Sequence, residues 1–226
     1  MPLSNLQRLK DFIHSLVPPG KLILPTNPEI TEPEAEAFIR AIDTGICQFM
    51  GEKFNIPICG KGPYSLLTFW NKEKKISVNR EYITQIAVMA LLVLDLGYPK
   101  EFLGFEYNHK FQGKLRKHTW PMDIVLFDPQ ERILLYVETK ISEEQCNSLE
   151  LYLLRNGPPD FDSPDRGNDN LRKAKYLWST RVEFLWLASP TTLEFPCPYV
   201  YRAEYGDRGM ILNKIWKVPE YKRIQS

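Results

Sequence analysis

The chain has 226 residues, of which 43% are hydrophobic and 25% charged, proportions typical of a globular protein with a substantial buried core. These values argue against a mainly disordered chain. Lys and Arg number 29 against 28 Asp and Glu, so the net charge of +1 does not by itself indicate nucleic-acid binding. Any attraction to DNA must come from a local patch of positive charge.

Residues 1–78 are predicted to form a mainly helical extension that packs on a second unit, residues 79–226. Apolar residues at helical spacing predict an opening helix, and Thr31-Glu32-Pro33-Glu34 is a capping box that starts a second one. One short apolar run, residues 65–70, favours a strand. The sequence assigns no function to this extension.

Residues 79–226 carry a regular alternation of helical and strand patterns. Asn79 caps a helix that runs to about Leu96 and ends at Gly97 in the left-handed conformation. The patterns that follow predict strands 103–112, 122–127 and 133–140, helices 142–155 and 170–179, and strands 182–189, 199–205 and 210–216. The core order is α-β-β-β-α-β. We therefore expect an α/β (α+β) fold with a mixed sheet flanked by helices.

The stretch MDIVLFDPQERILLYVETK, residues 122–140, reads as two apolar strands joined by a polar turn. A turn centred between residues 130 and 131 pairs Phe127 with Leu134, Val125 with Tyr136, and Asp123 with Glu138. Because side chains alternate with a period of two, Glu138 and Lys140 share the face on which Asp123 lies. A one-residue bulge would shift this register.

The carboxylates of Asp123 and Glu138, placed opposite each other on one face of the hairpin, need a positively charged partner. Directly opposed residues have Cβ atoms roughly 5 Å apart, where like charges destabilise a sheet. Lys140 can contribute, and a hard divalent cation such as Mg²⁺ suits a carboxylate pair. The alternative is a strand pair that ends in a solvated salt bridge, since the pattern Asp…Glu-x-Lys is loose.

This order of elements, with Asp123 in the second core strand and Glu138-Thr139-Lys140 closing the third, resembles the PD-(D/E)XK nuclease superfamily. Within it, LGYPKEFLGFEYNHKFQ followed by MDIVLFD and ILLYVETK is similar to the N-terminal nuclease domain of the motor (R) subunit of type I restriction enzymes. The resemblance covers residues 79–189, and it implies a restriction-endonuclease-like core.

The resemblance also implies roles for individual residues. It makes Asp123, Glu138 and Lys140 catalytic, and it gives one or two Mg²⁺ (or Mn²⁺) ions Asp123, Glu138 and the carbonyl of Thr139 as ligands. Glu106 matches a glutamate of the preceding strand, and Glu81 is the candidate for an acid from the first helix. A solvated glutamate in the first helical turn is the alternative for Glu81.

Some features depart from the relatives. The family's Gln-x-x-x-Tyr on the helix after the lysine is represented by Arg172-x-x-x-Tyr176, and the proline stands two residues before Asp123. No Walker A pattern occurs, so the chain has no recognisable motor. It would act alone, as a homodimer, or with a separate translocase or specificity subunit.

DNA contacts are expected from two basic segments. HKFQGKLRKHTW, before Asp123, offers Lys110, Lys114, Arg116 and Lys117, and the later helix offers Arg172 and Tyr176. The alternative for the first segment is a solvated basic loop. For the second, Arg172, Lys173 and Lys175 would form the solvated face of a helix that buries Leu171, Ala174 and Leu177.

The sequence therefore predicts a Mg²⁺-dependent DNA nuclease, and the expected activity is that of an endonuclease of the restriction type. A nuclease-fold module that binds DNA or an assembly without catalysis is the alternative. A third interpretation is a metal-independent interaction protein in which Asp123 and Glu138 lie on different faces.

The cysteines and the N-terminus indicate a cytoplasmic location. MPLSNLQRLKDFIHSL has no signal-peptide core, and no apolar run approaches the roughly eighteen residues of a membrane span. No C-x-x-C pair occurs, so neither a zinc site nor a disulfide framework is expected of the four widely spaced cysteines, Cys47, Cys59, Cys146 and Cys197. We expect reduced thiols and no membrane partner.

Overall fold

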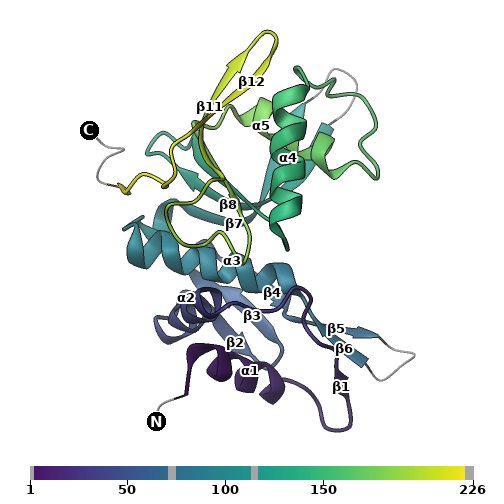
Figure 1. Ribbon diagram of the computed structural model, residues 1–226, viewed down its shortest axis with the longest axis vertical. Helices are drawn as coiled ribbons and strands as arrows, with labels where there is room; N and C mark the ends of the chain where they lie inside the picture. The colour runs from purple at the N-terminus through teal and green to yellow at the C-terminus, as the bar shows by residue number, and fades with distance from the viewer. Residues whose placement is uncertain (1–2, 71–74, 113–116, 222–226) are drawn as a thin grey trace.

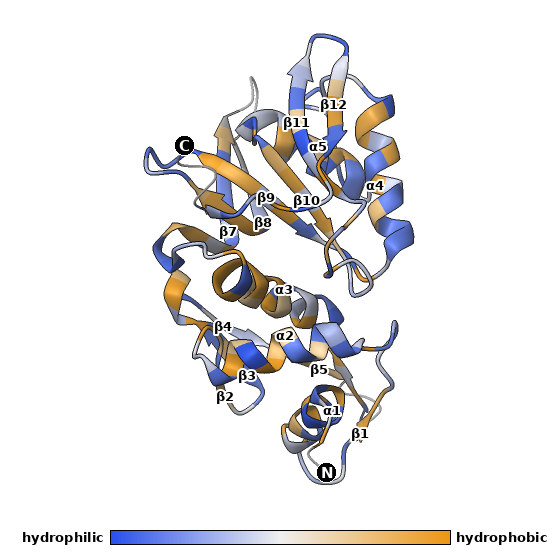
Figure 2. Cartoon of the chain, turned by 60° about the vertical axis from the view of Figure 1, so that its left-hand side comes forward, coloured by the Kyte–Doolittle hydropathy of each residue, from blue (hydrophilic) through white to orange (hydrophobic). Residues whose placement is uncertain are grey.

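The computed structural model describes residues 3–70, 75–112 and 117–221 (Figure 1). A six-stranded sheet and two neighbouring helices form the half of the molecule that follows residue 102, and two small sheets and two helices form the half that precedes residue 79. A single helix, α3, lies between the halves (Figures 1 and 2). The predicted mixture of helices and a mixed sheet is confirmed.

The large sheet has the strand order β12-β11-β10-β9-β8-β7. Every neighbouring pair is antiparallel except β9 and β10, which are parallel. Parallel neighbours need a long crossover, which α4 and α5 provide here. The bounds are β7 Leu103–Gln112, β8 Lys117–Phe127, β9 Ile133–Thr139, α4 Glu143–Arg155, α5 Asp169–Thr180, β10 Phe184–Ala188, β11 Val200–Gly206 and β12 Gly209–Lys214.

Helix α3, Arg80–Ala90, is buried on nearly all sides. It contacts α2 on one side and strands β8 and β9 on the other, and Figure 2 shows its largely apolar colouring between them. Its C-terminal part, residues 86–90, is apolar on all sides, as expected of a helix in such a central position, and its polar side chains lie on residues 80–85. A π-helical turn, Leu91–Asp95, extends it, and Gly97 follows with a φ of 71°, as predicted for the residue that ends the helix.

The described part of residues 1–78 contains two helices, and the expectation of a mainly helical extension is wrong because six short strands accompany them. The helices are α1 Asn5–Ser15 and α2 Glu32–Asp43, the latter capped by Thr31 as predicted. Strands of two to five residues are too short for an alternation of polar and apolar residues to identify. They are β1 Leu22–Ile23, β2 Gln48–Met50, β3 Lys53–Ile56, β4 Lys61–Ser65, β5 Leu67–Trp70 and β6 Lys75–Val78, in the orders β1-β6-β5 and β2-β3-β4.

The β8–β9 hairpin has the predicted register near the site. Val125 pairs with Tyr136, and the neighbouring pairs are Ile124–Val137 and Leu126–Leu135. Close to the turn the prediction is wrong, because the register shifts after Leu126 and Phe127 pairs with Ile133. The Asp128 carboxylate accepts hydrogen bonds from the backbone N–H groups of Gln130 and Arg132, both at 2.9 Å, and these bonds close the turn with one residue fewer than predicted between Phe127 and its partner.

Strand β8 begins earlier than predicted. The structure extends it back to Lys117, where it pairs with β7 through Lys110–Thr119 and His109–Trp120. The segment before Asp123 is therefore one strand of a long ribbon rather than a loop between short strands. The side-chain alternation of a ribbon sends neighbouring basic residues to opposite faces.

A buried ion pair joins α3 to the N-terminal half. The Arg80 guanidinium contacts the Glu34 carboxylate of α2, with Nη1 to Oε1 at 2.6 Å, and its Nε donates to the carbonyl of Pro28 at 3.0 Å. Glu34 is fully buried and also accepts a hydrogen bond from Thr84 at 2.7 Å. Since Arg80 directly precedes Glu81, this pair fixes the first turn of α3.

We predict that Arg80→Met lowers the free energy of unfolding by about 3 to 5 kcal/mol, because it leaves the buried Glu34 carboxylate without its cation. Urea denaturation measures the change. Arg8→Met is the control, since the Arg8–Asp43 pair is exposed and is expected to contribute about 1 kcal/mol at most. Equal effects of the two substitutions would contradict the role assigned to Arg80.

Candidate active site

Seven of the residues singled out in the sequence line one cavity of about 430 Å³. They come from α3, from the adjacent strands β7, β8 and β9 together with the residue that follows β9, and from α5. These seven are Glu81, Glu106, Asp123, Glu138, Lys140, Arg172 and Tyr176, and Asp169 and Lys173 join them in the lining.

Asp123 lies near the middle of the site and is 6% exposed. Its Oδ2 accepts hydrogen bonds from the backbone N–H and the hydroxyl of Thr139, both at 2.7 Å. Burial, followed by repulsion from Glu138, raises the pKa of the Asp123 carboxyl well above its ordinary value. Thr139 thus fixes the orientation of Asp123 across the two strands.

Glu138 is fully buried and lies between two ammonium groups. Its Oε1 is 2.8 Å from Lys140 Nζ and 2.9 Å from Lys173 Nζ, and its Oε2 accepts a hydrogen bond from the Tyr136 hydroxyl. Burial alone would raise the pKa of Glu138, but the charges of Lys173 and Lys140 outweigh it, so this pKa is lowered. Of the two carboxylates, Glu138 is therefore the one whose surroundings favour the ionised form.

Lys140 is positioned by the sheet and by α5. Its backbone N–H donates to the carbonyl of Ala188 at 2.7 Å, which continues the parallel pairing of β9 with β10. Its Nζ donates to the Asp169 carboxylate at 2.8 Å in addition to its ion pair with Glu138. Burial would lower the pKa of Lys140, but Glu138 and Asp169 outweigh it and raise this pKa. Lys140 is thus held as a cation in the cavity.

Two further acids face the same space. Glu81, in the first turn of α3, has a pKa raised by burial and by the charge of Glu138, so the alternative of an isolated solvated residue is wrong. Glu106 has a φ of 45°, an unusual backbone conformation for a residue with a side chain, and lies between the pairs Phe105–Ile124 and Tyr107–Met122. Strained residues of this kind cluster at functional sites.

The alternative of a solvated helix face is wrong for both Lys173 and Lys175. Lys173 is 8% exposed at Glu138, and Lys175 is fully buried with its Nζ bonded to the Ser163 carbonyl and 3.6 Å from Asp165. The spacing of residues along the helix indicates that Lys173 is buried. Lys173 precedes Leu177 by four residues, so the two side chains lie on the same face of α5.

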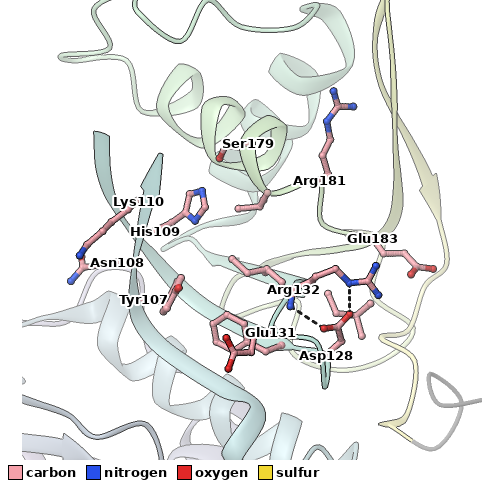
Figure 3. Close-up of a pocket in the computed structure, with 14 residues that line it drawn as sticks. Tyr107, Asn108, His109, Lys110, Asp128, Glu131, Arg132, Ser179, Arg181 and Glu183 are labelled. Atoms are coloured by element: carbon pink, nitrogen blue, oxygen red, sulfur yellow. Dashed lines mark hydrogen bonds and ion pairs between the residues drawn. The ribbon is translucent and has the colours of Figure 1, made fainter. Parts of the chain in front are cut away.

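Lys110, the described basic side chain of the predicted segment, does not line this cavity. Lys110 lines a second cavity, which also receives Arg132 and Arg181 and lies along β7, the β8–β9 turn and the end of α5 (Figure 3). Lys117 opens β8, and Lys114 and Arg116 lie outside the described residues. Of the predicted DNA contacts, the candidate active site thus contains Arg172 and Tyr176.

A divalent cation in this cavity would have to be held by few protein ligands. Among the residues that the structure describes, no three His, Cys, Asp or Glu side chains are close enough to hold one ion together. Mg²⁺ is often bound by one or two carboxylates and several waters. Glu138 Oε1 is buried against the ammonium groups of Lys140 and Lys173, so Asp123 and Glu138 fit a partly hydrated Mg²⁺ if one of these ammonium groups is displaced, rather than an all-protein cage.

Comparison with known proteins adds no relative, since no protein-family model and no curated protein sequence matches the chain. Within the described ranges, no helix combines the length and apolar character needed to cross a membrane. The function must therefore be argued from the cavity itself.

We predict that Asp123→Asn becomes more stable relative to the parent as the pH rises from about 4 to about 8. A carboxyl with a raised folded-state pKa contributes stability below its unfolded pKa, here 3.8, and loses that contribution as the pH rises through the folded pKa. The variant has no such loss. Chemical denaturation at several pH values, with a chelator present, measures the difference.

The exposed turn residue Asp207 supplies the control, because Asp207→Asn removes a carboxylate from the surface and is measured at the same pH values. A difference between Asp123→Asn and the parent that stays constant with pH would contradict the raised pKa.

Proposed function

We propose that the protein is a Mg²⁺-dependent nuclease that hydrolyses phosphodiester bonds in DNA, with an endonuclease of the restriction type as the best match. The observation that carries this proposal is the convergence of Asp123, Glu138 and Lys140 in one cavity with Glu81 and Glu106. An aspartate, a glutamate and a lysine on two paired strands are the residues that phosphodiester hydrolysis needs for charge stabilisation and for orienting water.

The order of elements supports the same proposal. From α3 the chain runs through β7, β8 and β9 to α4 and α5 and then to β10, which agrees with the α-β-β-β-α-β order expected of a restriction-endonuclease-like core. Asp123 lies on the second of these strands, and Glu138 and Lys140 lie at the end of the third. A fold by itself does not establish an activity, so the cavity carries more weight than the topology.

Asp123 and Glu138, with the Thr139 carbonyl, would hold the metal ion, which when bound supplies charge neutralisation of the phosphate and a more acidic water. Thr139 keeps Asp123 oriented through its N–H and hydroxyl. Lys140 directs its ammonium into the cavity, where it can orient the attacking water and balance negative charge that develops on the phosphate. Tyr136 restrains the second oxygen of Glu138.

Arg172 is the best-placed residue for contact with the DNA backbone. It lines the cavity, and its Nε is buried without a hydrogen-bond partner among the described residues, while its Nη2 pairs with Asp169 at 3.0 Å. A guanidinium with an unused donor suits a phosphate oxygen. Tyr176, one turn further along α5, adds an aromatic surface beside it.

The proposal places the protein in the cytoplasm together with DNA, and its four cysteines are free thiols. Its substrate, duplex or otherwise, would be reached by the protein alone, as a homodimer or through a separate translocase or specificity subunit. The alternative is a nuclease-fold module that binds DNA without cutting it.

We predict that the purified protein cleaves plasmid or linear DNA with Mg²⁺ or Mn²⁺ and not with a chelator. Asp123→Asn, Glu138→Gln and Lys140→Met are each expected to reduce the cleavage rate by about 100-fold or more, because each removes a ligand or charge from the cavity. The rate is measured by gel electrophoresis of DNA products under single-turnover conditions.

Two exposed residues provide matched controls for this assay. Asp207→Asn removes a surface carboxylate and Lys53→Met a surface ammonium, and both are expected to leave the rate unchanged. DNA binding without metal-dependent cleavage would favour the non-catalytic alternative. Cleavage that survives loss of Asp123 and Lys140 in folded protein would falsify the proposed site.

We predict that Arg172→Gln weakens DNA binding and reduces the slope of log Kd against log salt concentration by about 1, since one phosphate contact is lost. Fluorescence anisotropy with labelled DNA, in a chelator that prevents cleavage, measures both quantities. Arg202→Gln on β11 is the control, because Arg202 is exposed and pairs with Glu183. A slope that Arg172→Gln leaves unchanged argues against a phosphate contact at this residue.

A further inference from the structure

The candidate active site contains a second lysine, and its surroundings differ from those of the first. Lys140 has two carboxylate partners, Glu138 at 2.8 Å and Asp169 at 2.8 Å. For Lys173, the described residues offer one carboxylate within ion-pair distance, Glu138 at 2.9 Å. Lys140 would therefore keep an anionic partner if Glu138 turned to another cation, whereas Lys173 would not.

Lys173 is also held in a way that permits movement of its ammonium group. Its Nζ lies 5.2 Å from the centre of the Tyr176 ring, and both residues line the cavity. A lysine side chain has four rotatable bonds and carries a compact charge, so its ammonium can leave Glu138 and stay beside the ring. The cavity in which it would remain is the one that also contains Arg172.

Glu138 Oε1 cannot bind both ammonium groups and a divalent cation at close range. Like charges a few ångströms apart in a poorly solvated site repel strongly. Lys140 is anchored at Asp169, so Lys173 is the cation that must move.

We propose that Lys173 is an internal counter-ion of the candidate metal site, one that leaves Glu138 when a divalent cation binds and then pairs with a phosphate of the nucleic acid. This inference rests on the proposed function. The Lys173–Glu138 ion pair makes metal binding weak in the absence of DNA. Metal binding is stronger when DNA is present, because the phosphate gives the displaced ammonium a new partner.

The test is Mn²⁺ binding to the protein by isothermal titration calorimetry, with and without a short DNA duplex carrying nuclease-resistant phosphorothioate linkages, which gel electrophoresis after the titration must show to be uncut. Lys173→Met is expected to bind Mn²⁺ about tenfold or more tightly than the parent without DNA, and to gain much less from adding DNA. Lys173→Arg keeps the positive charge and is expected to bind Mn²⁺ as weakly as the parent.

Two further variants separate this effect from changes elsewhere. Lys175→Met removes a buried lysine of the same helix that pairs with Asp165 outside the cavity lining, and it is expected to leave the Mn²⁺ affinity unchanged. Glu138→Gln is expected to abolish Mn²⁺ binding. Thermal unfolding with and without Mn²⁺ reports the same ranking for any variant that yields too little protein for calorimetry.

The outcomes distinguish the two proposals. If Lys173→Met binds Mn²⁺ as the parent does, or more weakly, Lys173 is not a displaceable counter-ion, while the nuclease proposal stands. If the parent and all variants bind no Mn²⁺, with or without DNA, the proposed metal-dependent function is wrong and this inference falls with it.

Discussion

The buried carboxylate of Glu138 imposes the constraint on which the rest of the site depends. A fully buried negative charge is costly unless cations and hydrogen-bond donors surround it, and here Lys140, Lys173 and the Tyr136 hydroxyl do so. These partners come from β9 and from α5, so the charge fixes how the helix lies over the sheet. Asp123, one strand away, is left with the less favourable environment and the higher pKa.

A second buried ion pair fixes the helix that joins the N-terminal half to the site. The Arg80–Glu34 pair fixes the start of α3, and the next residue, Glu81, faces the cavity. The N-terminal half therefore reaches the candidate active site through one helix rather than through loops of its own. A segment to which the sequence assigned no function thus positions one of the acids, because α3 is packed between the two halves.

The sequence predicted what local periodicity encodes. Alternation along the β8–β9 hairpin was enough to pair Val125 with Tyr136, and hence to bring Asp123 and Glu138 to one face. It could not predict the shift after Leu126, because that depends on how Asp128 closes the turn. Of the six short N-terminal strands the sequence predicted one, the run 65–70 that contains β5, because the others show no clear alternation of polar and apolar residues. It misjudged Lys173, since a lysine is assumed to be solvated unless a buried partner is known.

The left-handed backbone conformation of Glu106 costs stability. Glycine would adopt a φ of 45° without strain, whereas a residue with a side chain does so at a cost of roughly 1 to 3 kcal/mol. The chain thus retains a carboxylate, held by the Gln85 amide at 3.1 Å, at a position where stability alone favours having no side chain. The residue that would relieve the backbone here is not the one the chain carries, and under the proposed function the carboxylate of Glu106 is what that cost retains.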